Sequence, residues 1–180
     1  MTEAITRFTE ACKATLAADP GSGGRRRIAA LLEDAIGDPA FVAACFEAGE
    51  TGRRELYRDP ELGFCLLAYD MEAPRISPPH DHGVSWAVYG QVSGHTDMTE
   101  YERLGDTQGP GAAELRKLRT YRLDPGNAGL YDVGCIHAIN YPAGARFLRV
   151  TGQDLESVPR LKFDLETSEA TEISSTTVPG

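Results

Sequence analysis

From residue 56 onward the chain is a succession of short apolar runs, and this pattern constrains the fold more than any other feature. The runs are rich in Val, Leu, Tyr and Phe, and they span residues 63–71, 85–101, 114–123, 128–134 and 145–155. Gly, Pro, Asp and Asn separate them, as is typical of an all-β sandwich or barrel. Because no long helical period intervenes, a parallel α/β sheet is disfavoured. We therefore predict a mainly β domain.

The first 50 residues have a different, helical periodicity. One apolar stripe has spacings of three and four residues and is formed by Ile5, Phe8, Cys12 and Leu16. A helical period resumes over residues 25–36. A third, short helix is expected next, with Asp38 as its cap, Pro39 in its first turn and Gly49 as its end.

A length of 180 residues is typical of one domain with a substantial core. We expect residues 1–50 to form helices packed on the barrel and residues 51–165 to form the barrel itself. Residues 166–180 are polar and small, which predicts a mobile C-terminal tail. The sequence leaves open whether the protein is a monomer or a homodimer.

Charge and composition exclude several classes of function. With 27 acidic and 18 basic residues, the net charge is −9. No Lys/Arg-rich run suits a phosphate backbone, so no nucleic-acid partner is expected. We also expect no export signal, because the first residues lack a continuous apolar run, and no membrane partner. The four cysteines form no CxxC pair, which favours reduced thiols and a cytoplasmic location.

Histidine is rare and clustered: His80, His82 and His95 lie close together, and His137 follows later. Two prolines precede His80, which disfavours a helix there. On a strand, side chains two residues apart share a face, so we expect the imidazoles of His80 and His82 to converge. Neutral imidazole is a good ligand for divalent iron, nickel, copper or zinc. His137, in another predicted strand, is the candidate third ligand.

An isolated H-x-H pair can also be a surface loop or a hydrogen-bonded polar pair, since clustered histidines are only a probabilistic signal. The strand context, the third histidine and the flanking glycines favour the metal site here. His95 follows the expected turn at Gly94, so we expect it to lie away from the metal.

Two stretches resemble the paired motifs of the cupin family. The first motif is an H-x-H, then a glutamate and a glycine; His80, His82 and Gly94 match, and the glutamate position falls on Ala87. In the second motif the matching residues are Gly126, Gly134 and His137. The resemblance implies a double-stranded β-helix, a jelly-roll-like barrel, with a small N-terminal helical segment added.

The missing glutamate implies a three-histidine site, which resembles that of the thiol dioxygenases, the cysteine dioxygenase branch of the cupins. The similarity covers about residues 54–155. It implies Fe(II) bound by His80, His82 and His137, with nickel, manganese or zinc as alternatives, and a small-molecule substrate together with O2. Arg54 falls at the position of the family's carboxylate-binding arginine. The alternative for Arg54 is a surface ion pair with an acidic neighbour.

The sequence departs from that branch after the third ligand. Where the family has a Ser-His-Tyr relay, Arg149 stands at the histidine and Thr151 at the tyrosine. The relay is therefore predicted to be lost. Arg149 becomes a second candidate for substrate binding, with an outward-facing strand position as its alternative. Tyr131 is the candidate to replace the relay tyrosine, because it lies six residues before His137.

These residues support three hypotheses. The first is an iron-dependent dioxygenase of the thiol dioxygenase type, acting on a small carboxylated substrate, with a thiol as one candidate. The second is a non-oxidative lyase or isomerase that uses the metal as a Lewis acid. The third is a non-catalytic cupin that binds a small molecule, because this fold carries many unrelated functions.

Overall fold

The computed structural model describes residues 1–46 and 50–173, in which a helical segment precedes a series of strands. The helices are α1 (Glu3–Ala18), α2 (Ser22–Ile36) and α3 (Pro39–Cys45). The strands are β1 (Gly52–Arg58), β2 (Cys65–Met71), β3 (Arg75–Ile76), β4 (Ala87–Ser93), β5 (Thr96–Arg103), β6 (Gly111–Ala112), β7 (Leu115–Leu123), β8 (Ala128–Tyr131), β9 (Ile136–Tyr141), β10 (Ala145–Thr151), β11 (Arg160–Asp164) and β12 (Glu169–Ile173).

The helices begin where local capping satisfies their free N–H groups. The Thr2 side chain accepts a hydrogen bond from the Ile5 amide at the start of α1, and Asp38 does the same for Ala40 at the start of α3. The predicted cap at Asp38 is thus confirmed. Helix α3 ends at Cys45, and the expected end at Gly49 lies outside the described residues. None of the described helices is long and apolar enough to cross a membrane.

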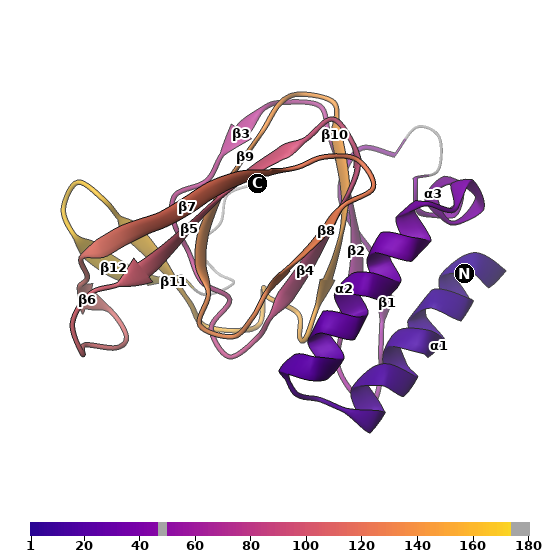
Figure 1. Cartoon of the computed structure of the whole chain (residues 1–180), viewed down its shortest axis with the longest axis horizontal. Coiled ribbons are helices and arrows are strands. Elements are labelled where there is room, and N and C mark those ends of the chain that lie inside the picture. The colour runs from indigo at the N-terminus through magenta and orange to yellow at the C-terminus, as the bar shows by residue number, and fades with distance from the viewer. Residues whose placement is uncertain (47–49, 174–180) are drawn as a thin grey trace.

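Two antiparallel sheets face each other and form the barrel (Figure 1). The first has five strands in the order β1-β2-β10-β4-β8, and the second has four in the order β3-β9-β5-β7. Neighbouring strands in each sheet are mostly far apart in sequence; β10, for example, lies between β2 and β4. This is the arrangement of a double-stranded β-helix, and it confirms the predicted mainly β fold with added N-terminal helices.

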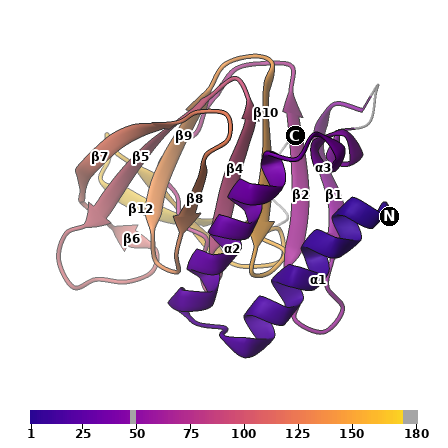
Figure 2. The same cartoon turned by 45° about the vertical axis from the view of Figure 1, so that its right-hand side comes forward.

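The helices cover the outer face of the five-stranded sheet (Figure 2). Every second residue of its central strands contributes to this core, whose sheet side includes Leu66, Ala68, Val88, Leu148 and Val150. The helix side of the same core includes Phe8, Cys12, Ile28, Leu32 and Phe41. The predicted apolar stripe of α1 is therefore the surface that packs on the barrel.

The alternate residues of the same strands face the barrel lumen, where they meet the second sheet. They include Cys65, Leu67, Tyr69, Ala87, Tyr89 and Phe147. Because both faces of the sheet are buried, β2 reads as a continuous apolar run rather than an alternating one. All four cysteines are unpaired.

The predicted tail from residue 166 is wrong for its first part, because residues 169–173 form β12. Strands β11 and β12 form an antiparallel hairpin, and β6 adds to its edge. The Asp164 side chain accepts hydrogen bonds from the amides of Glu166 and Thr167 and so stabilises the turn. Phe163 and Ala170 are buried against the barrel. The small polar residues of β12 thus form a strand because pairing with β11 buries Ala170 beside Phe163.

Candidate metal centre

His137 and His80 are placed by backbone pairing. His137 lies on β9, as predicted, and its amide and carbonyl bond the carbonyl and amide of His80, both at 2.9 Å. On its other side the segment of His80 pairs with β11, where the Asp81 amide donates to the Leu161 carbonyl at 3.0 Å. His80 is therefore held between two strands, although it forms only isolated bridges.

The prediction that both H-x-H residues occupy one regular strand is wrong for His82. Its carbonyl accepts a bond from the Ser85 amide, which makes a tight turn. Gly83, in this turn, has a positive φ of 59°, and a Cβ there would lie 2.2 Å from the Pro159 carbonyl oxygen. Pro78 and Pro79 have no N–H to donate, so the pairing of the segment before His80 is interrupted. A bridge followed by a turn still brings both rings to the lumen.

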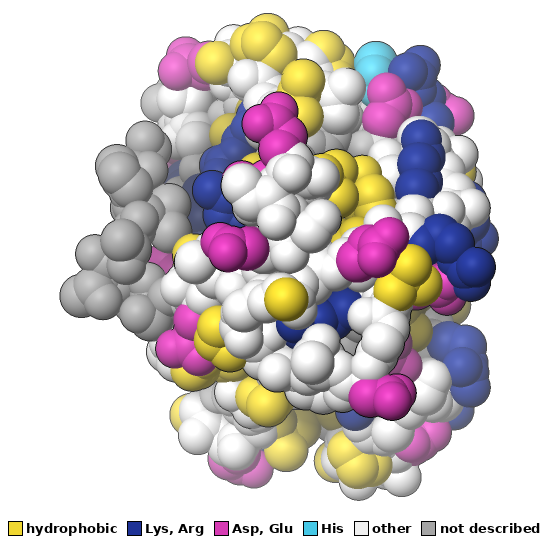
Figure 3. All heavy atoms as spheres, turned by 90° about the vertical axis from the view of Figure 1, so that its left-hand side faces the viewer, with side chains coloured by type: hydrophobic (Ala, Val, Ile, Leu, Met, Phe, Trp, Pro, Cys, Tyr) yellow, Lys and Arg dark blue, Asp and Glu magenta, His cyan; other side chains and the backbone are white. Residues whose placement is uncertain are grey.

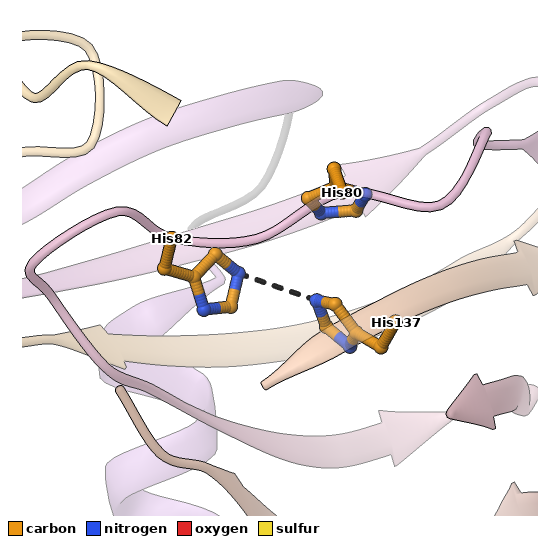
Figure 4. A group of neighbouring side chains, drawn as sticks. All are labelled: His80, His82 and His137. Carbon is orange, nitrogen blue, oxygen red and sulfur yellow. Dashed lines mark hydrogen bonds between the residues drawn. The ribbon is translucent and has the colours of Figure 1, made fainter. Parts of the chain in front are cut away.

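The three imidazoles converge on one space (Figure 4). One nitrogen from each of His80, His82 and His137 can be chosen so that all three lie within 4.8 Å of one another. The Nε2 atoms of His82 and His137 are 3.2 Å apart. Two nitrogens bound to one metal ion at about 2.1 Å lie roughly 3 Å apart when their angle at the metal is near 90°. The Nδ1 of His80 faces the Pro78 carbonyl at 3.0 Å, which leaves Nε2 for a metal.

Burial keeps these imidazoles neutral. The pKa of His80 is lowered to about 4, mainly by burial and to a smaller extent by the charges of Arg160 and Arg149, while the hydrogen bond to the Pro78 carbonyl opposes this shift. The pKa values of His82 and His137 lie well below 6.5, first because of burial and then because of the neighbouring His80. At neutral pH all three rings therefore carry free lone pairs, which is the state that binds a metal ion.

No carboxylate joins this group among the described residues. Ala87, at the position of the cupin glutamate, is fully buried on the lumen face of β4. Gly94, the glycine of the first motif, has a φ of 67°, and a Cβ there would lie 3.1 Å from the Ala145 Cα. The group can hold a metal ion through nitrogen alone.

Arg149 is in the lumen. It lies on β10 opposite Leu67 and Tyr89, both of which face inward. Its guanidinium carbon is 4.9 Å from the centre of the Tyr69 ring and 5.8 Å from that of Tyr89, and Nη1 donates to the Tyr89 hydroxyl at 3.4 Å. The Tyr89 ring in turn lies 5.7 Å from the His137 ring. The outward-facing alternative for Arg149 is excluded by this register.

Tyr131 packs against the third ligand. Its ring centre is 4.3 Å from that of His137, and its hydroxyl is hydrogen-bonded to the Tyr121 hydroxyl at 2.8 Å. The Tyr121 hydroxyl also donates to Glu100 at 2.9 Å. The Nδ1 atom of His137 is buried and has no hydrogen-bond partner in the described part of the chain. On the Nδ1 side, packing against Tyr131 rather than a hydrogen bond therefore orients this imidazole, while its Nε2 faces the Nε2 of His82.

The structure does not bring Arg54 to the histidines. Arg54 pairs across β1 with Ala68, whose side chain belongs to the core beneath the helices. Its guanidinium donates to the Cys45 carbonyl at 2.8 Å and forms an ion pair with Glu50. The expected carboxylate-binding role is therefore corrected: Arg54 joins the sheet to the end of α3. The cause is strand parity, because Arg54 is one position away from the inward-facing register.

The position of His95 is as expected. His95 is partly exposed, 3.9 Å from Asp97, and outside the histidine group. Trp86 belongs to the core beneath the helices rather than to the lumen. Two lumen residues were missed by sequence reasoning, Tyr69 and Arg160. Tyr69 could have been found from the parity of β2, whereas Arg160 lies in a strand that the apolar pattern does not reveal.

A groove of about 710 Å³ lies elsewhere, on the outer face of the four-stranded sheet. Its lining includes Thr99 and Lys117 from the sheet and Phe163 from the hairpin, but none of the three histidines. The face of the molecule toward β6, β7 and β12 shows acidic and basic side chains interspersed with hydrophobic ones (Figure 3). Because none of the three histidines lines the groove, it is separate from the metal-binding group.

No protein-family model matches the chain, and no curated protein matches it. Solved structures similar to the fold include KdgF from Halomonas sp., with 15% identity and a TM-score of 0.40 over 55% of this chain and 74% of that one. The Cnp3 cupin domain of Schizosaccharomyces pombe has 12% identity and a TM-score of 0.43, over 57% and 60%. An uncharacterized protein with a double-stranded β-helix domain from Klebsiella pneumoniae has 14% identity and a TM-score of 0.40, over 59% and 75%. The likeness concerns the barrel and says nothing about a substrate.

The strand order and the histidine group together define the class of protein: a double-stranded β-helix whose lumen can hold a metal ion. The donor set fits a divalent transition metal, because three neutral imidazoles converge and imidazole suits iron, nickel, copper and zinc.

Proposed function

We propose that this protein is a metal-dependent cupin oxygenase, a non-haem iron dioxygenase that acts on a small carboxylated substrate, with a thiol as one candidate. One observation carries the proposal: a three-nitrogen group, which no carboxylate of the described residues joins, shares the barrel lumen with Arg149. A neutral ligand set leaves the full charge of the metal to attract an anionic substrate.

Fe(II) is the metal that fits the proposal best, with nickel, manganese and zinc as alternatives. When bound, iron supplies redox chemistry with O2 and open coordination positions for the substrate. His80, His82 and His137 hold it, and the low pKa values of these imidazoles keep them available at neutral pH.

The protein's own contribution is to orient the substrate. Arg149 can hold a carboxylate through a two-pronged hydrogen bond, since its guanidinium lies against the faces of Tyr69 and Tyr89 and forms no ion pair within residues 1–46 and 50–173. Tyr131 positions the His137 ring by packing against it. Because the Tyr131 hydroxyl is bonded to Tyr121, we assign it no proton transfer at the metal.

Oxygen consumption tests the proposal. Protein loaded with Fe(II) under anaerobic conditions is mixed with aerated buffer and a panel of small thiols and carboxylic acids. We expect uptake of O2 with one class of compound and its loss in His82→Ala. His95→Ala is the matched control, because His95 lies outside the group, and it should behave as the wild type. Uptake that persists in His82→Ala would contradict the proposal.

A non-oxidative lyase or isomerase is the second candidate. It is favoured by the loss of the thiol dioxygenase relay, since Arg149 and Thr151 stand at the relay positions and the Thr151 hydroxyl is buried without a hydrogen-bond partner among the described atoms. This candidate predicts turnover by zinc-loaded protein in the absence of oxygen. Complete dependence on O2 would reject it. Binding of a small acid without any turnover would instead indicate a non-catalytic cupin.

A further inference from the structure

Two arginines without an acidic partner lie beside the histidine group, and only one of them enters the proposed function. The second is Arg160, the first residue of β11. Most other arginines of the barrel form ion pairs with Asp or Glu, but within residues 1–46 and 50–173 no carboxylate lies within 4.0 Å of a side-chain nitrogen of Arg149 or Arg160. The Nε atoms of both are buried and have no hydrogen-bond partner in these residues.

Strand register places Arg160 on the side of the histidines. His80 bridges both His137 and Lys162, so these three side chains share one face. Arg160 lies two residues before Lys162 on β11 and therefore points to the same face. The alternate residues of this strand, Leu161 and Phe163, pack instead in the core with Ile136.

The two guanidinium groups act on each other and on the ligands. Burial lowers the pKa of Arg160, and the charge of Arg149 is the next cause. Both arginines also lower the pKa values of His80 and His82. Arg149 comes from β10 and Arg160 from β11, so two separate elements deliver positive charge to one side of the lumen.

The nearby acids are already bound elsewhere. Glu156 is the acid that acts on both arginines, but its carboxylate is paired with Arg53 at 2.9 Å. The Asp81 carboxylate accepts hydrogen bonds from two backbone amides, those of Gly83 and Leu161. Two like charges that are partly removed from water repel each other unless an anion lies between them.

We propose that Arg149 and Arg160 together bind a small dianionic substrate beside the three-histidine group, with one acidic group at each guanidinium. This inference rests on the proposed function for the presence of a metal next to the anion. It adds a substrate class: a short dicarboxylic acid, or an acid with a phosphate in place of the second carboxylate. Charge-assisted, two-pronged bonds to each guanidinium supply the recognition.

Anion binding to the metal-free protein tests this inference without any catalysis. Metal is stripped from the protein with a chelator, which is then removed by dialysis. Malonate, inorganic phosphate and acetate are each titrated into the protein at pH 7.5, and binding is measured by isothermal titration calorimetry. We expect malonate to bind at least tenfold more tightly than acetate. Arg149→Gln and Arg160→Gln should each weaken malonate binding at least tenfold. Tighter binding of phosphate than of malonate would indicate that the second acidic group of the substrate is a phosphate.

Arg146→Gln is the matched control, because Arg146 lies on the same strand as Arg149 but pairs with Asp70 at the surface. It should leave malonate binding unchanged. Equal losses in all three variants would overturn the inference, since a general charge effect would then explain them. So would equal affinities for malonate and acetate, no binding of any dianion, or normal malonate binding by Arg160→Gln.

Arg160→Lys covers the case in which Arg160→Gln fails to fold, as judged by its melting temperature. Lysine keeps the charge but loses the planar fork, so we expect malonate affinity to fall at least threefold. Unchanged affinity would overturn the paired recognition. Because these titrations require neither metal nor oxygen, a negative result in them leaves the oxygen-uptake test of the proposed function unaffected.

Discussion

At the scale of single residues, the face of a strand on which a side chain lies decides its role. Arg53 pairs with the inward-facing Tyr69, whereas Arg54 pairs with the outward-facing Ala68. A shift of one residue therefore moves a guanidinium from one side of the sheet to the other. Motif spacing identified the three histidines, because their chemistry is distinctive. It could not assign Arg54, because spacing along the sequence leaves the exact strand register undetermined.

The buried imidazoles predict a pH dependence of stability in the metal-free protein. Their pKa values are lowered on folding, so below pH 6.5 the unfolded chain takes up protons that the folded chain does not. The free energy of unfolding should therefore fall as the pH decreases from about 6.5 to 4, by at most about 1.4 kcal/mol per pH unit for each imidazole. Urea denaturation at several pH values measures it.

His82→Asn should make this dependence shallower, because it removes one of the three buried titrating groups. His95→Ala should keep it, since His95 is partly exposed and outside the group. A free energy of unfolding that stays constant between pH 6.5 and 4.5 would show that the imidazoles are not buried as the structure has them.

At the scale of elements, the apolar pattern predicts the strands that are buried on both faces and misses several of the strands that carry many charged residues. The helices and strands β2, β4 and β10 were predicted, because their apolar residues are dense and periodic. Strand β1 and the β11–β12 hairpin were not, because charged residues occupy much of their length. These strands depend on long-range pairing, which local composition does not encode.

The absence of a side chain at Gly90 allows α2 to approach the sheet closely. A Cβ at this position of β4 would lie 2.8 Å from Leu32 Cγ and 2.9 Å from its Cδ2. Gly90→Ala should therefore lower the free energy of unfolding by about 1–3 kcal/mol through overpacking. Chemical denaturation measures this change.

Leu32→Ala supplies the matched test, because it removes the side chain that the new methyl group meets. Alone it should cost about 2–5 kcal/mol, since Leu32 is fully buried. In the double variant the methyl group enters the vacated space, so the combined cost should be less than the sum. Strictly additive costs would mean that α2 does not contact β4 at this point.

At the scale of the whole molecule, the metal-binding group is a product of topology. His80 and His82 precede β4, His137 lies on β9, and the strand order of the barrel brings these distant segments together. Sequence motifs predicted this meeting through a family resemblance. The partner of Arg149 in the lumen, Arg160, comes from a hairpin that only the folded chain reveals.

Metal stoichiometry tests the central claim most directly. Wild-type protein is stripped, loaded anaerobically with Fe(II), freed of excess metal and analysed by plasma emission spectrometry. His80→Ala, His82→Ala, His137→Ala and His95→Ala are treated in the same way, with circular dichroism as a check of folding. We predict one iron per chain in the wild type and in His95→Ala, and substantially less in the other three variants. Wild-type protein without iron, or folded His137→Ala that still holds one iron per chain, would contradict a metal centre built from these three histidines.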